Sequence, residues 1–229
     1  MSSSCPIAPP FDSSLVIQTT ELVTRKVLFR FHKNTYQADS FNPNVGRRIE
    51  IPEEGARFNP FPGAPTANIP TLYAADTLTA AALESVFHDV EHIPSPTYLR
   101  SRLTEWSYSK LMTTRTLLLI NLVNPQLRQL GVSGRSSSIT ESELIHTPPS
   151  EYPNTRTWAQ SLHQAIPDLD GLAWRPRLGG TGVAYVFFGD RCQPGDLRTH
   201  SSAIAAISGP GFSKIHTIAN RANISIVEL

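Results

Sequence analysis

The chain has 229 residues, enough to bury the core of one large domain, and its 19 prolines and 13 glycines indicate many irregular connections. Its 20 basic and 19 acidic side chains nearly cancel, so no overall charge favours nucleic acid or an anionic membrane surface. The first residues lack the pattern of a signal peptide, and the longest apolar stretch, LLLINLV, is too short to span a bilayer. We therefore expect a cytoplasmic protein that binds neither nucleic acid nor membrane directly.

The first part of the chain is predicted to contain loops and short strands. Residues 1–24 are rich in serine and proline and are expected to form an N-terminal extension over the surface. Residues 26–32 alternate between two faces, which predicts a strand, and residues 71–74 predict a second one. Between them, residues 34–70 form a long polar segment, and loops of such length are commonly functional.

A helix with one central carboxylate is predicted to follow the second strand. Asp76 is the expected N-cap, and Glu84 lies in the middle of the helix, opposite its apolar stripe. At helical spacing Glu84 is beside Ala80 and Ala81, whose small side chains leave room for a ligand to approach. The alternative is a solvated glutamate in a segment that simply favours helix.

The second part of the chain predicts one more helix and several strands. Residues 98–110 fit either a helix or an extended segment, and residues 131–153 are loop-like. A helix opens at Asn154 and ends near Pro167. Strands are predicted at residues 115–125, 171–177, 182–190 and 222–229. Without a regular βαβ rhythm, the pattern predicts a single α+β domain with a mixed or antiparallel sheet and flanking helices.

Several kinds of active site are excluded by the absence of their motifs. His88 and His92 are four residues apart, but Pro94 lies just beyond them, and no other metal-binding set is present. Cys5 and Cys192 lack a metal-ligand spacing and an activating context. No nucleophile elbow and no phosphate-binding loop occurs. We therefore expect a site without metal.

Arg57, Tyr73 and Glu84 are the remaining candidates for chemistry. A guanidinium group binds pyrophosphate through two contacts, and an aromatic ring stacks on a planar ring. A carboxylate that faces a sugar supports an oxocarbenium-like transition state. NAD combines a pyrophosphate, a planar ring and a labile glycosidic bond. Because these residue types are common, ordinary polar roles remain the alternative.

Four segments in a fixed order carry a resemblance to a known family. They are LFRFH (residues 28–32), GARFNP (residues 55–60), TLYAADTLTAAALES (residues 71–85) and TWAQSLHQAIPDLDGLAWRPR (residues 157–177). Together they resemble the RES domain. The resemblance predicts a RES-like domain over residues 25–190, with residues 191–229 packing on the same domain as a C-terminal segment.

The RES resemblance implies a fold like that of the ADP-ribosyltransferases and a toxin of a bacterial toxin–antitoxin pair. NAD is the implied substrate, cleaved at its nicotinamide–ribose bond with water or phosphate as acceptor. The implied partner is an Xre-like helix-turn-helix antitoxin, in a homo-oligomer or a toxin–antitoxin hetero-oligomer. Two alternatives stay open: an ADP-ribosyltransferase that modifies a protein, and a catalytically weakened NAD-binding or interaction module.

The same resemblance implies roles for individual residues. Glu84, Tyr73 and Arg57 are the implied catalytic residues. The predicted substrate-binding residues are Arg30, Arg57, Tyr73, Trp174 and Arg177. Two of them have a structural alternative, since Trp174 fits a core position and Arg30 fits an edge strand where it pairs with an acid.

One position departs from the family pattern. Pro176 stands where the family usually has a serine, and proline has neither a hydroxyl nor a backbone N–H to donate. Arg175, Arg177 or Thr181 are the candidates to replace the lost hydrogen bond. The departure puts the rate, the acceptor or the activity itself in question.

Overall fold

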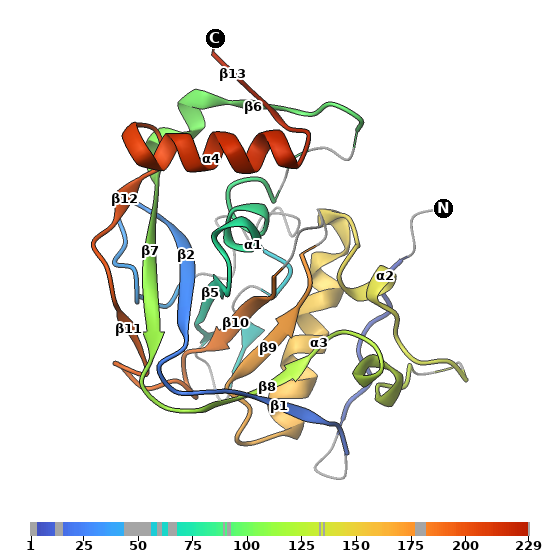
Figure 1. The fold of residues 1–229 in the computed structure, drawn as a ribbon. Helices are drawn as coiled ribbons and strands as arrows, with labels where there is room; N and C mark the ends of the chain where they lie inside the picture. The colour runs from blue at the N-terminus through green and yellow to red at the C-terminus, as the bar shows by residue number, and fades with distance from the viewer. Residues whose placement is uncertain are drawn as a thin grey trace.

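The computed structural model describes residues 4–11, 16–43, 56–58, 61–63, 68–88, 90, 93–132, 134, 136–176 and 182–228. Figure 1 shows the elements, which follow along the chain in this order: β1 (Thr19–Leu22), β2 (Val27–Lys33), β3 (Phe61–Pro62), β4 (Asn68–Ile69), β5 (Thr71–Ala75), α1 (Leu78–Leu83), β6 (Thr97–Leu99), η1 (Arg100–Glu105), β7 (Trp106–Thr113), β8 (Leu117–Asn121), η2 (Gln126–Gln129), α2 (Glu141–Leu144), η3 (Pro149–Glu151), α3 (Tyr152–Ala165), β9 (Gly171–Trp174), β10 (Ala184–Phe188), β11 (Leu197–Thr199), β12 (Ile204–Ala205), α4 (Gly209–Arg221) and β13 (Ser225–Val227).

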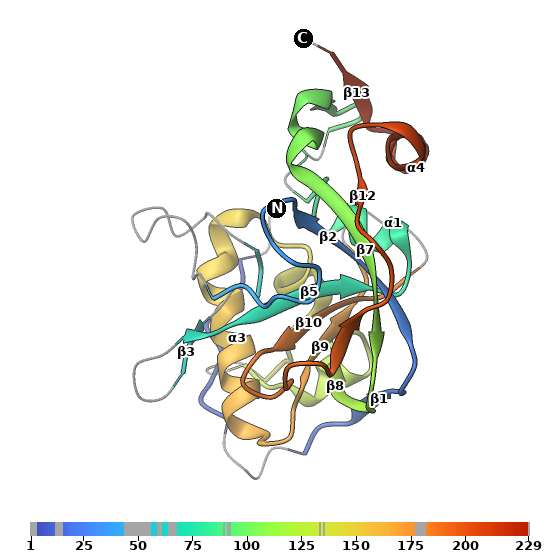
Figure 2. The same ribbon diagram turned by 90° about the vertical axis from the view of Figure 1, so that its left-hand side faces the viewer.

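The main sheet of the described residues is mixed and strongly curled (Figures 1 and 2). Its strand order is β1-β8-β9-β10-β5-β2-β7-β11, and β12 also pairs with β7. Neighbouring strands are antiparallel except for β8 and β9, which are parallel. The predicted α+β domain with a mixed sheet is confirmed.

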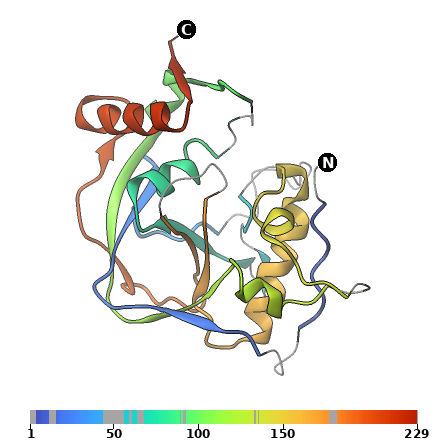
Figure 3. The same ribbon diagram turned by 45° about the vertical axis from the view of Figure 1, so that its right-hand side comes forward.

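The two faces of the sheet carry different layers. One face carries a cluster that includes Leu28, Leu72 and Ala74. The opposite face carries two clusters: one lies under α3 and includes Trp158 and Trp174, and the other lies under α1 and α4. On this helical side α3 and α1 cover different parts of the sheet, and α4 lies above α1 (Figures 1 and 3).

The predicted strands form because their apolar side chains are buried on the curled sheet. Residues 26–32 and 71–74 correspond to β2 and β5, and the ambiguous residues 98–110 contain η1 and parts of β6 and β7. The sequence reading missed α4, whose first turn, Gly-Pro-Gly, is typical of a loop. Proline at the second position of a helix removes no helical hydrogen bond, so α4 still forms and buries Ile215 and Ile218.

The first helix differs from its prediction. It has only six residues, and Thr77 is its N-cap, accepting a hydrogen bond from the Ala80 N–H. Asp76 has another role: its carboxylate accepts the N–H of Val183 at 2.7 Å and thereby ties β10 to the start of α1. Its carboxylate is therefore committed to the neighbouring strand.

The described part of the N-terminal segment packs on α3. Cys5 is 1% exposed, and the Trp158 indole N–H donates to the Pro6 carbonyl at 2.7 Å. The Phe11 ring packs against Trp158, with 5.8 Å between ring centroids. Residues 4–11 therefore cover the part of α3 that carries Trp158. In the described part of the chain, no helix has both the length and the apolar character to cross a membrane.

Candidate active site

Arg57 and Glu84 form a buried ion pair between α1 and α3. The Arg57 Nη1 atom is 3.6 Å from the Glu84 Oε2 atom, and the side chains are 1% and 7% exposed. At this distance the pair is not hydrogen-bonded. The Arg57 Nε and Nη1 atoms have no hydrogen-bond partner among the described residues. Such an arginine has donors available for a ligand oxygen or for a rotated carboxylate.

Glu84 reaches this pair because α1 is short. The helix ends at Leu83, and Glu84 is its C-cap residue, with its backbone N–H bonded to the Ala80 carbonyl. The predicted position in the middle of a helix is therefore wrong. Ala80 and Ala81 do not leave open space beside Glu84, because both are buried in the cluster under α1. Their small size lets the helix pack closely on the sheet.

Tyr73 and Trp174 are two aromatic residues of the candidate site that contact each other. The Phe58 N–H donates to the Tyr73 hydroxyl oxygen at 2.7 Å, which fixes the chain directly after Arg57. The Tyr73 and Trp174 rings pack edge to face, with 5.8 Å between their centroids. Burial raises the pKa of Tyr73 above its usual value, so the hydroxyl stays neutral. Trp174 is fully buried, and its indole N–H has no partner among the described residues.

The first turns of α3 supply three side chains that the sequence reading missed. The Thr155 hydroxyl donates to the Arg57 carbonyl at 2.6 Å, and the Tyr152 ring lies 5.3 Å from the Arg57 guanidinium carbon. The Tyr152 hydroxyl is 2.9 Å from the His88 Nε2 atom. Arg156 is half-buried and lies one turn after Tyr152. These residues are spaced i, i+3 and i+4 on one helix, and this spacing was the sequence signal that they lie on one helix face.

Arg30 is not brought into this cluster. On β2 it alternates with Phe29 and Phe31, so it shares the face of Leu28, whereas Tyr73 points to the helical side. Its Nη1 atom donates to the Ala38 and Ser40 carbonyls, both at 2.7 Å. Burial lowers the pKa of Arg30 to about 10, which leaves it cationic at neutral pH. A substrate contact by Arg30 stays a prediction, while its visible bonds hold the loop after β2.

The comparisons with known proteins decide the family. The chain matches the model of the RES domain over residues 27–205. The chain belongs to the RES-domain family. The match includes Arg57, Tyr73 and Glu84 and extends past residue 190, the predicted end, as far as β12. A comparison with curated proteins gives no match. Membership of the RES family is compatible with a toxin that acts on NAD.

Pro176, which stands where the RES family usually has a serine, lies two residues after the end of β9. Pro176 is buried and Arg175 is exposed. Arg177 and Thr181, two candidates to replace the serine, lie outside the described residues. The described residues resume at Gly182, which has a positive φ of 149°. A Cβ atom at this position would lie 2.5 Å from the Thr77 Oγ1 atom. The β9–β10 connection therefore comes back against the start of α1.

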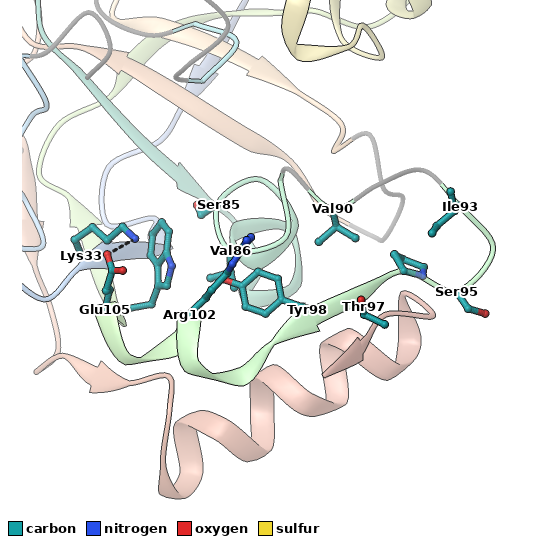
Figure 4. Close-up of a pocket in the computed structure, with 12 residues that line it drawn as sticks. Lys33, Ser85, Val86, Val90, Ile93, Ser95, Thr97, Tyr98, Arg102 and Glu105 are labelled. Atoms are coloured by element: carbon teal, nitrogen blue, oxygen red, sulfur yellow. Dashed lines mark hydrogen bonds and ion pairs between the residues drawn. The ribbon is translucent and has the colours of Figure 1, made fainter. Parts of the chain in front are cut away.

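A separate cavity of about 630 Å³ lies on another side of α1 (Figure 4). It is lined by the segment after Glu84 and by residues of β6, η1 and β7. Its Lys33 is held 2.8 Å from Glu105 and 4.2 Å from the centre of the Trp106 ring. None of the predicted site residues lines this cavity. Within the described ranges, no group of three His, Cys, Asp or Glu side chains could hold a metal ion.

Proposed function

We propose that this RES domain cleaves the nicotinamide–ribose bond of NAD, with water or phosphate as acceptor. The observation that carries the proposal is the buried Arg57–Glu84 pair beside Tyr73, within the residues that match the RES domain. A carboxylate held by an arginine is a fixed negative charge, and such a charge lowers the energy of a developing cation. An exposed glutamate would not have a fixed position.

In the proposed reaction the bond between the anomeric carbon and the nicotinamide nitrogen breaks. The electron pair of that bond moves to the nicotinamide ring, which leaves as a neutral molecule, and positive charge develops on the ribose. Glu84 stabilises that charge, Arg57 orients Glu84, and Tyr73 lies on the nicotinamide side. An oxygen of water, which loses a proton to solvent, or an unprotonated oxygen of phosphate then bonds to the anomeric carbon.

The test of the activity is to incubate purified protein with NAD, with and without phosphate, and to identify the products by mass. ADP-ribose would indicate hydrolysis, and ADP-ribose-1″-phosphate would indicate phosphorolysis. A mass increase on an added protein would indicate the transferase alternative. NAD that is bound but not consumed would support the weakened module, which the buried Pro176 favours. We expect a chelator to leave the rate unchanged, because the proposed chemistry needs no metal.

We further propose that the protein is the toxin of a pair with an Xre-like helix-turn-helix antitoxin. A cell that makes an NAD-consuming enzyme needs a partner that keeps NAD from the site. Residues 34–43 and 136–153 connect elements of the domain and include exposed residues such as Tyr36 and Ser136, and such connections commonly bind partners. Hydrogen exchange should slow in one of these segments when the antitoxin binds. Unchanged exchange in both would count against this docking surface.

A further inference from the structure

The Arg57 guanidinium is enclosed by contacts that leave two of its nitrogen atoms without a hydrogen bond. The side chain is 1% exposed, and neither Nε nor Nη1 has a hydrogen-bond partner among the described residues. Glu84 Oε2 lies 3.6 Å from Nη1, and the centre of the Tyr152 ring lies 5.3 Å from the guanidinium carbon. A buried donor without a partner costs free energy, so this arrangement calls for a functional reason.

The Tyr152 ring is the neighbour that can hold a guanidinium group without using its N–H donors. An aromatic face attracts a cation within about 6 Å of the ring centre, and the attraction is stronger where water is excluded. Tyr152 is 1% exposed, so its contact with Arg57 is shielded from water. A carboxylate or carbonyl at the same place would hold Arg57 by occupying its donors. The ring therefore leaves Nε and Nη1 for a ligand oxygen or for Glu84.

Tyr152 is itself held by a residue of the segment that follows Glu84. Its hydroxyl oxygen is 2.9 Å from the His88 Nε2 atom, and the two ring centroids are 5.5 Å apart. The Thr155 hydroxyl, which binds the Arg57 carbonyl at 2.6 Å, is also 3.0 Å from the Tyr152 carbonyl. The side-chain contacts and the short segment after α1 therefore form a closed ring, whose members are Glu84, Arg57, Tyr152 and His88.

We propose that Tyr152, held by His88, is a positioning residue that fixes Arg57 relative to Glu84. This inference rests on the proposed function of the site. In that reaction Glu84 must face the developing positive charge, and its direction depends on where Arg57 lies. The contact between Tyr152 and His88 also joins α3 to the segment after α1. A loosened Tyr152 therefore affects the transition state more than the binding of NAD.

The test is the steady-state kinetics of NAD turnover by variants of Tyr152, each measured at a temperature where thermal unfolding shows it to be folded. Tyr152→Leu removes the ring and should lower kcat by about tenfold or more, the scale of misplacing a catalytic group. The KM should stay within about threefold, because an interaction needed only in the transition state changes kcat. Tyr152→Phe keeps the ring and loses the bond to His88, so kcat should fall by roughly threefold to tenfold, the scale of one hydrogen bond.

His88→Ala tests the other side of the same contact. It should lower kcat about as much as Tyr152→Phe does. The double variant should be slower than either single variant by no more than about twofold, because both changes remove one and the same hydrogen bond. A contact with a merely structural role would lower the thermal stability of these variants and leave kcat of the folded protein unchanged.

Phe212→Leu is the matched control, because the Arg100 guanidinium carbon lies 4.2 Å from the centre of the Phe212 ring on α4. It removes the same kind of contact elsewhere and should leave kcat and KM unchanged. If Tyr152→Leu does not fold, Tyr152→Phe and His88→Ala decide the question.

A kcat within about twofold of wild type for both folded variants, Tyr152→Phe and His88→Ala, would overturn the inference and leave the proposed function intact. The same kcat for folded Tyr152→Leu would also overturn it. A wild-type protein that consumes no NAD would overturn the proposed function, and this inference with it.

Discussion

At the scale of single residues, the buried Arg57–Glu84 pair governs both stability and chemistry. Removing one partner leaves the other charge buried without a counter-ion. We expect Glu84→Gln to lower the free energy of unfolding by about 3 kcal/mol, measured in urea. Combining it with Arg57→Met should cost less than the sum of the two single changes, because the double variant no longer buries an unpaired charge.

The exposed pair of Lys33 and Glu105 is the matched control for this measurement. Its atoms approach to 2.8 Å, but its side chains are 34% and 61% exposed. Glu105→Gln should therefore cost less than about 1 kcal/mol. Equal losses from Glu84→Gln and Glu105→Gln would argue against a buried charge pair.

The sequence was informative about residues wherever a motif defined the site. Arg57, Tyr73 and Glu84 were predicted as one group, and the structure brings them together. Arg156 was missed because the family resemblance began at the next residue, Thr157. Arg30 was grouped with the others because a linear motif does not reveal which face of a strand a side chain takes. The face of the sheet that Arg30 takes depends on how β2 pairs with β5.

At the scale of elements, α3 holds the turn at Arg57 through Thr155. Thr155→Val keeps the shape of the side chain but leaves the Arg57 carbonyl without this donor at 2.6 Å. We expect a loss of stability of about 1–3 kcal/mol and a fall in kcat for NAD, because Glu84 loses its positioned partner. Thermal unfolding and steady-state kinetics measure the two effects.

Thr155→Ser is the matched control for this change, since it keeps the hydroxyl. It should retain most of the activity that Thr155→Val loses. If both variants keep wild-type kcat, the α3 contact does not position the site.

The connection after β9 gives a second prediction at this scale. Pro176→Ser introduces a hydroxyl at a buried position and frees the backbone of Arg175 from its extended bias. We expect no gain in turnover and a loss of about 1 kcal/mol in the free energy of unfolding. The measurement is kcat/KM for NAD together with urea unfolding. A several-fold increase in kcat/KM would mean that the missing serine limits the enzyme.

Elements were predictable where local pattern and tertiary packing agreed. The alternation in residues 26–32 and the apolar run in β10 identify strands that the sheet buries. The length of α1 was not predictable, because the Ala-rich segment favours helix and no local signal stops it at Leu83. The end of α1 depends instead on packing under α4 and on the Arg57–Glu84 contact.

At the scale of the whole molecule, the N-terminal segment is part of the folded domain. Deleting residues 2–11 would expose Trp158 and remove the Pro6 carbonyl that its indole N–H contacts. The buried Cys5 and the Phe11 contact would be lost as well. We expect a loss of about 2 kcal/mol, or roughly 4–8 °C in Tm, by calorimetry. An unchanged Tm would mean that these residues behave as the surface extension expected from the sequence.

The complete arrangement joins segments that are far apart in the chain. The turn at Arg57, the end of α1 and the start of α3 meet on one side of the curled sheet, so 98 residues of sequence separate the Thr155 hydroxyl from the carbonyl that it binds. Such long-range pairing leaves no local trace in the sequence, whereas strand periodicity does. The α+β class was therefore predictable, and the α3 half of the site was not.

The central claim is that Glu84 acts on NAD at this site. Its most direct test is the rate of nicotinamide release from NAD by the wild-type protein and by Glu84→Gln, at a temperature where thermal unfolding shows both to be folded. We predict turnover by the wild type and a loss of about 10²-fold or more in the variant, the scale of removing one electrostatic stabiliser. Turnover of Glu84→Gln within threefold of wild type would contradict the account.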